Sequence, residues 1–399
     1  MLRRRVAFPL IAVVSIAIAS FIASCSGDDT TIGSPAPSTG NTGSVPGDSV
    51  PGDSVPPMLD VMAGEAFPAA RCEANRAAGT ITYLSSYDFA ASASIIDVLV
   101  ADSKGYYDDL CLDVTITPSF STENYPLIAA NDAQFSSGGS FSEMVDFAGA
   151  NDAGFVALAV EGRTGIDALI TKDGAVPTLA AIEGKKIGVK GAITPSVKAM
   201  LAKEGLVEGT DYETVNLEGF DPLAHIEIPD IIGFPGFKSN EPKQLEAAGA
   251  PFKLYDPSDF GIPGSFGVLY TNLTFLTEQP TAAQDFMRAT MRGLADAVAD
   301  PAAAARVAID ALNASGNALF LSSEGETARW AVESKLVDEG TTPDTPLGLP
   351  LIDQLTIEVT EYAEIGLFEG VPPIIETMVD ASVLDGVYDD AGVVIWPAE

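Results

Sequence analysis

Cations, cysteines and histidines are scarce in this 399-residue sequence. Lys and Arg number 21 against 56 Asp and Glu, so the formal net charge at pH 7 is −35. Nucleic-acid binding requires clustered Lys and Arg that displace counterions, and adhesion to anionic lipid by charge requires the same. The composition therefore argues against a nucleic-acid partner and against membrane binding by charge alone.

The single histidine, His225, and the three cysteines exclude two further classes of function. A zinc site needs Cys or His ligands at short spacing, and a nucleophilic triad needs a His close to a Ser or Cys. His225 precedes a predicted strand, where we expect a structural role or a ligand contact. We therefore predict no metal site, no cofactor and no catalytic residue, in a protein that is not an enzyme.

Long apolar runs are missing after the first 24 residues. Three Arg at positions 3–5 precede an apolar run over residues 6–23, which is the pattern of a secretory signal peptide; a retained transmembrane helix is the alternative. The sequence Ile22-Ala23-Ser24-Cys25 resembles the bacterial lipobox, in which the Cys is lipidated. We expect a signal peptide over 1–24 and a lipid anchor on Cys25, with ordinary cleavage nearby as the alternative.

Lipidation of Cys25 would leave two cysteines, Cys72 and Cys111. Both would lie in an oxidising compartment, where a disulfide between them is expected; two free thiols are the alternative. Residues 25–70 are rich in Gly, Ser, Pro and Asp, and the sequence of Ser44–Asp48 repeats at Ser49–Asp53. Such a segment cannot bury a core, so we predict a disordered tether followed by a folded part from about residue 71.

The folded part alternates short strands with helices. Strands are predicted at 80–85, 112–118, 133–137, 155–160, 167–171, 186–189, 212–217, 230–234 and 266–270. Helices are predicted at 94–104, 125–131, 141–151, 195–204, 282–299, 302–315, 324–339 and 353–365. This alternation indicates an α/β fold with parallel sheets flanked by helices, and two such blocks indicate two lobes. Ligands bind such folds at the carboxyl ends of the strands.

Three segments resemble one family, in this order along the chain. They are Val98–Asp109 followed by Leu112-Asp113-Val114, then Ile182–Val189, then Phe286–Pro301. Together they are similar to the substrate-binding proteins of ABC transporters, of the type that binds nitrate, taurine and sulfonates or thiamine-pyrimidine precursors and riboflavin. The resemblance covers nearly all of residues 79–399.

The resemblance implies a two-lobed type II periplasmic-binding fold, each lobe a mostly parallel sheet flanked by helices. Residues 71–168 would begin lobe one, 169–275 would form lobe two, and 276–399 would supply the hinge-packing and lobe-one helices. Two crossing segments, near 162–170 and 268–272, would form the hinge. The partners implied are a small-molecule ligand and the permease and ATPase subunits of an importer, with the protein itself a monomer.

Cys111 departs from the family pattern, which has Gly at this position. We expect Cys111 to be free of left-handed geometry and bonded to Cys72, with residues 70–75 acting as a latch on lobe one. Candidate ligand-binding residues follow the strand ends, although capping or core roles are alternatives for each cluster. They are Tyr87, Asp88, Phe89, Ser121, Thr122, Ser136, Ser137, Gly138, Thr194, Ser196, Phe234, Phe237, Asn240 and Glu241.

The chemistry of these candidates indicates the ligand class. The segment Asp230–Pro242 resembles the stretch ending in Asn-Glu of the thiamine-pyrimidine and riboflavin branch, and Arg163 is the only Arg between Arg76 and Arg288. Free N–H groups at residues 138–140 would favour an anion or a carbonyl oxygen. Aromatic, amide and carboxylate groups favour a nitrogen heterocycle, with a sulfonate, taurine or nitrate anion as the alternative. A thiamine-pyrimidine synthase-like enzyme is a further alternative.

Overall fold

The computed structural model describes residues 60–219, 221–316, 321–368, 371–372 and 374–398. All of them belong to one compact unit, which begins at Pro56. The predicted signal peptide, Cys25 and most of the tether lie outside the described residues. Within the described ranges, no helix combines the length and the apolar character needed to cross a bilayer.

The first sheet has five strands in the order β2-β1-β3-β10-β4. They are β1 (Thr80–Leu84), β2 (Asp113–Thr117), β3 (Phe135–Gly138), β4 (Phe155–Gly162) and β10 (Phe266–Asn272). Strand β1 pairs in parallel with β2 and β3, whereas β10 runs antiparallel to β3 and β4. All residues of β4 and β10 are buried, which explains why most of their residues are apolar.

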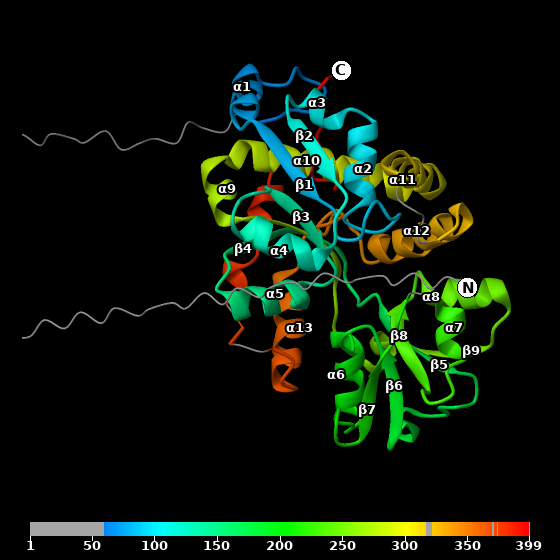
Figure 1. Ribbon diagram of the computed structural model, residues 1–399. Coiled ribbons are helices and arrows are strands. Elements are labelled where there is room, and N and C mark those ends of the chain that lie inside the picture. Colours follow the sequence, from blue (N-terminus) through cyan, green and yellow to red (C-terminus); the bar gives the residue numbers. More distant parts are fainter. Residues whose placement is uncertain (1–59, 220, 317–320, 369–370, 373, 399) are drawn as a thin grey trace, which may run out of the picture. The chain divides into compact units, whose positions relative to one another are not determined.

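Helices cover both faces of this sheet (Figure 1). One core joins the sheet to α2 (Ile96–Ser103), α10 (Pro280–Ala299) and α11 (Pro301–Ser315), and a second core joins it to α4 (Ser121–Ala129), α5 (Phe141–Asn151) and α13 (Ile352–Glu364). Four further α-helices accompany this sheet: α1 (Ala69–Ala77), α3 (Tyr106–Asp109), α9 (Leu273–Glu278) and α12 (Ser323–Asp338).

A second group of strands follows β4 along the chain. Strand β5 (Asp167–Lys172) pairs antiparallel with β8 (Gly233–Phe237) and with β9 (Phe252–Tyr255), while β6 (Lys185–Val189) pairs in parallel with β7 (Tyr212–Asn216). The helices of this group are α6 (Pro195–Lys203), α7 (Pro222–Ile226) and α8 (Glu241–Ala248). The mostly parallel pairing expected here was wrong for β5, because both of its neighbours, β8 and β9, run antiparallel to it. Strand β9 was not predicted from the sequence.

Strand β8 starts at Gly233, three residues after its predicted start, and its first residue packs closely against β5. A Cβ atom at Gly233 would lie 2.0 Å from the carbonyl oxygen of Ile170. Only glycine allows β8 to approach β5 this closely.

Two segments connect the first sheet to the second group of strands. Residues 163–166 leave β4, and residues 261–265 lead into β10. These segments touch, since a Cβ atom at Gly264 would lie 2.7 Å from the backbone nitrogen of Gly165. The second crossing was expected at 268–272, but those residues lie inside β10 and form part of the first sheet.

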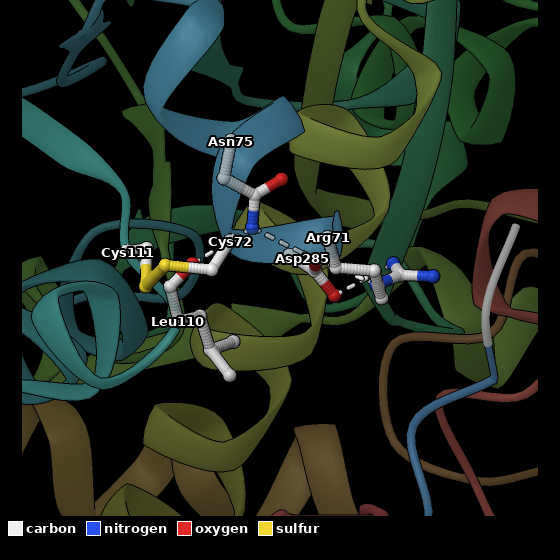
Figure 2. Close-up of a disulfide and its surroundings, with 6 residues drawn as sticks. All are labelled: Arg71, Cys72, Asn75, Leu110, Cys111 and Asp285. Atoms are coloured by element: carbon white, nitrogen blue, oxygen red, sulfur yellow. Dashed lines mark hydrogen bonds and ion pairs between the residues drawn. A yellow bond between two sulfur atoms is a disulfide. The ribbon is translucent and has the colours of Figure 1, made fainter. Parts of the chain in front are cut away.

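The predicted disulfide between Cys72 and Cys111 is confirmed, with 5.2 Å between the Cα atoms. It joins α1 to the end of α3 (Figure 2). The expectation that Cys111 escapes left-handed geometry was wrong, because its φ is +59°. The backbone amide of Cys111 donates to the backbone carbonyl of Asp108, and the amide of Leu112 donates to the backbone carbonyl of Tyr107. This helix-ending motif requires a left-handed residue whatever its side chain is.

Candidate ligand-binding site

A cavity of about 440 Å³ lies where the strand ends of the two groups meet. Its walls come from the loop after β1, the β3–α5 turn and β10 on one side, and from the segments after β6 and β8 on the other; α12 also contributes. The volume is within the range of 300–1,000 Å³ that is usual for small-molecule sites. This arrangement makes the cavity the candidate site.

Half of the predicted site residues line this cavity. They are Tyr87, Ser121, Gly138, Thr194, Phe237, Asn240 and Glu241. Each lies at or just after the end of a strand, or at the start of a helix, which is the position that the strand-end rule selected. The side chain of Thr122 lies outside the described residues.

The other predicted residues do not line the cavity, because they are committed to local contacts. They are Asp88, Phe89, Ser136, Ser137, Ser196 and Phe234. Asp88 accepts the backbone amide of Phe89 at 2.8 Å, and the Ser196 hydroxyl donates to Asp167 at 3.0 Å. Ser136 and Ser137 are fully buried; Ser136 donates to the Leu84 carbonyl of β1, and Ser137 accepts the amide of Ser86 just after β1. Phe234 is 1 % exposed and belongs to the core around β5 and β8.

Four charged residues of the cavity wall were missed by the sequence analysis: Glu143, Lys190, Arg329 and Glu333. Glu143 and Ser140 form a capping box at the start of α5, so the Ser-x-x-Glu spacing could have located Glu143 at the strand end. Arg329 and Glu333 lie on α12, far along the chain from every predicted cluster. No local pattern connects that helix to the cavity.

The amides of Ser140 and of the first residues of α5 are not free to bind an anion, contrary to the expectation for the start of this helix. The amides of Phe141, Ser142 and Glu143 donate respectively to Ser265 Oγ at 3.0 Å, Glu358 Oε1 at 3.2 Å and Ser140 Oγ at 3.3 Å. The Ser140 amide donates to the Glu143 carboxylate at 3.2 Å. The protein's own oxygens therefore occupy the positions that an anionic ligand would use at this helix terminus.

Carboxyl groups gather behind this end of the cavity. Glu143 lines the cavity, and desolvation by the surrounding protein raises its pKa. Burial, with the Glu143 charge as a smaller cause, raises the pKa of Asp167 to about 7. Burial also raises the pKa of Glu358 to about 7. Such a concentration of carboxyl groups favours a ligand that places a cation or an N–H donor at this end of the cavity, and disfavours an anion there.

Glu241 begins α8 and is 5 % exposed, so it is both a helix-start residue and a cavity residue. Its Oε2 accepts the Phe237 amide at 2.9 Å, and its Oε1 lies 3.5 Å from the Lys190 Nζ. Gly236 makes this packing possible, because a Cβ atom there would lie 2.9 Å from the Glu241 carboxyl. Glu241 therefore reaches the cavity with both oxygens already in contact with protein donors.

Aromatic rings and hydroxyls complete the walls. The ring of Tyr87 meets Phe120 edge-on with centroids 5.9 Å apart, and the Arg329 guanidinium lies 5.7 Å from the Tyr87 ring centre. Burial raises the pKa of Tyr87 to about 12, so its hydroxyl stays protonated at neutral pH. The Thr194 hydroxyl is buried and, among the described residues, has no hydrogen-bond partner. These groups can stack against a planar ligand and bond to its edge.

Two residues discussed from the sequence lie away from the cavity wall. Arg163 donates to the carbonyl groups of Gly340, Thr345 and Pro346. His225 bonds through Nε2 to the Glu218 carbonyl at 2.9 Å and packs against Phe234. Within the described ranges, no group of three or more His, Cys, Asp or Glu is arranged to hold a metal ion.

Comparison with solved structures shows the fold of periplasmic binding proteins. The aliphatic sulphonate-binding protein SsuA of Escherichia coli is 11% identical, with 75% of this chain and 92% of that chain covered and a TM-score of 0.56. The nitrate-binding protein NrtA of Synechocystis is 13% identical, with 77% and 87% covered and a TM-score of 0.54. A Candida albicans protein described as having the generic periplasmic binding protein fold is 14% identical, with 76% and 96% covered and a TM-score of 0.54.

No curated protein matches the chain. A family model described as "NMT1/THI5 like" matches residues 92–304, which is more than half of the chain. The match begins in the loop after β1 and ends in α11, so it includes every strand except β1 and most of the cavity wall. The chain therefore belongs to the NMT1/THI5-like family.

Proposed function

We propose that this protein is the substrate-binding component of an ABC importer and works outside the cytoplasmic membrane. It captures a small molecule in the cavity between the two groups of strands and delivers it to a permease that an ATPase subunit drives. The single observation that carries this proposal is a cavity of about 440 Å³ at the meeting point of the strand ends, in a fold shared with sulfonate- and nitrate-binding proteins. We also propose that it acts as a monomer held to the membrane by a lipid on Cys25.

The ligand that best fits the cavity is a nitrogen heterocycle, such as a thiamine-pyrimidine precursor or a riboflavin-like compound. Glu143 offers a carboxylate to ring or amino N–H groups, and Tyr87 and Phe237 offer aromatic faces. The amides at the start of α5, which could have bound an anion, are occupied by Ser265, Glu358 and Ser140. A carboxylate facing an apolar ring with N–H donors satisfies both partners.

A sulfonate, taurine or nitrate anion is the second candidate, because Lys190 and Arg329 both line the cavity. Each of these cations has a carboxylate partner in the structure. Lys190 lies 3.5 Å from Glu241, and Arg329 lies 3.2 Å from Glu326. An anion would have to compete with these carboxylates, which makes the heterocycle the better fit.

Binding without chemistry is the proposed mode of action. The one imidazole, His225, bonds to a backbone carbonyl and lies outside the cavity wall. A thiamine-pyrimidine synthase-like activity, which was the enzymatic alternative, would need a reactive group in that wall. The carboxylates there are better placed to accept hydrogen bonds from a bound ligand.

A thermal-shift panel on the mature protein tests the ligand class. We expect an aminopyrimidine or a flavin to raise the melting temperature, while taurine, nitrate and alkanesulfonates do not. A single-site ligand at a hundredfold excess over its dissociation constant stabilises the folded state by about 2.7 kcal/mol. Stabilisation by the anions alone would overturn the heterocycle assignment and leave the importer assignment standing.

The same panel on Glu143→Gln tests the residue that carries the assignment. Gln preserves the capping box of α5, because Gln and Glu both serve at this position. We expect the heterocycle-induced shift to disappear in this variant. Glu123→Gln, which changes an exposed acid on α4, is the matched control for net charge. An unchanged shift in Glu143→Gln would show that Glu143 does not bind the ligand.

A further inference from the structure

The carboxylate of Glu333 joins the two walls of the cavity. Its Oε1 accepts the Ser239 hydroxyl at 2.6 Å. Its Oε2 accepts the Ser92 hydroxyl at 2.7 Å and the Ala93 amide at 2.8 Å. Ser92 and Ala93 belong to the loop after β1 of the first sheet, whereas Ser239 lies in the turn between β8 and α8 of the second group. One side chain therefore bonds to both groups of strands.

Helix α12 is built to hold Glu333 in this place. Glu326, Arg329 and Glu333 lie at the i, i+3 and i+7 positions of one helix face, and each is at most 3 % exposed. Glu326 accepts the Ala91 amide at 3.0 Å and pairs with Arg329. The buried face of α12 is thus charged, and it fixes the 91–93 loop at two points.

The neighbours of α12 belong to both groups of strands. Helix α12 contacts α11 and β4 of the first group and α8 of the second. Figure 1 shows α12 and α8 next to each other beside the strand ends. The turn that contains Ser239 is also held from its other side, where the Lys238 amide donates to the Ile166 carbonyl of the first crossing segment at 2.9 Å. Ser239 is 1 % exposed, so the contact with Glu333 is shielded from water.

We infer that Glu333 is a positioning residue that keeps the two cavity walls closed against each other, and that its bond to Ser239 is the contact that must break when the cavity opens. The bonds to Ser92 and Ala93 anchor the carboxylate in the first group and stay intact during opening. The role in ligand retention rests on the proposed function, whereas the contact itself does not.

Two serine variants separate the closing contact from simple structural support. Ser239→Ala removes the bond between the groups, and Ser92→Ala removes a bond of similar length to the same carboxylate within the first group. Both are measured on the mature protein without ligand, by hydrogen–deuterium exchange and by small-angle X-ray scattering. We expect Ser239→Ala to increase exchange of the amides at 235–241 and 91–95 about tenfold or more and to raise the radius of gyration. Ser92→Ala should keep the wild-type radius of gyration.

Melting temperature shows that both variants remain folded, and small equal decreases are expected for the loss of one hydrogen bond. If the two variants have the same exchange and scattering, Glu333 is only a structural residue and the inference is overturned. The inference is also overturned if Ser239→Ala leaves both wall segments protected as in the wild type. No ligand is used, so a negative result in the thermal-shift panel would leave this outcome unaffected.

Discussion

Replacement of Asp285 by Ala is expected to lower the free energy of unfolding by about 3–5 kcal/mol, because it strands two buried cations. The Asp285 carboxylate is fully buried. It accepts Arg71 through both oxygens at 2.8 and 2.9 Å and Asn75 at 2.9 Å (Figure 2). It also accepts Arg288 at 3.3 Å. Arg71 is 3 % exposed and Arg288 is 1 % exposed, so water cannot replace the lost carboxylate.

Denaturant unfolding of the oxidised protein measures this effect. Asp296→Ala on the same helix is the matched control, because Asp296 also forms an ion pair, with Lys104 at 2.7 Å, but both side chains are partly exposed. An exposed pair contributes about 0–1 kcal/mol. Equal losses in the two variants would contradict the view that Asp285 fastens α1 to α10. If Asp285→Ala does not fold, Asp285→Asn keeps the shape and removes the charge.

Residues 70–75 are fastened to the first group as expected, by the disulfide and by the contact between Arg71 and Asp285. Only the disulfide could be predicted from the sequence. The odd cysteine count indicated the disulfide between Cys72 and Cys111. The bond between Arg71 and Asp285 spans more than two hundred positions, and no local pattern connects two residues so far apart. Burial decides its importance, and burial depends on the complete fold.

Elements with strong local signals were predicted well. Helix α5 has its predicted bounds, and α10 starts two residues before its predicted start, because caps and apolar periodicity are encoded locally. Strand pairing is not encoded locally, so the antiparallel partners of β5 were missed. The same contrast holds for the site. Cavity residues at strand ends, such as Tyr87 and Glu241, were predicted, whereas the contribution of α12 to the cavity wall was not.

The free energy of unfolding is expected to fall as pH rises from about 4 to 7, and Asp97→Asn should remove one defined part of this dependence. Asp97 on α2 and Glu161 on β4 are at most 1 % exposed, and among the described residues none of their four carboxyl oxygens has a hydrogen-bond partner. Burial raises the pKa of Asp97 from 3.8 to about 6, and burial followed by the Asp97 charge raises that of Glu161 well above its usual value. Because the folded state holds these protons more tightly than the unfolded chain, the stability they contribute is complete below about pH 4 and is lost as pH rises through the folded pKa.

The size of this effect follows from the shift of Asp97. A pKa that rises from 3.8 to about 6 on folding means that folding favours the protonated form over the ionised form by a free energy of about 3 kcal/mol. Urea unfolding at pH 4, 6 and 8 should therefore show Asp97→Asn gaining about 3 kcal/mol relative to the wild type between pH 4 and 8. Asp109→Asn, at an exposed acid of α3, removes the same charge at the surface. The difference between its free energy of unfolding and that of the wild type should be the same at all three pH values. A constant difference between Asp97→Asn and wild type at all three pH values would mean that folding does not raise the pKa of Asp97.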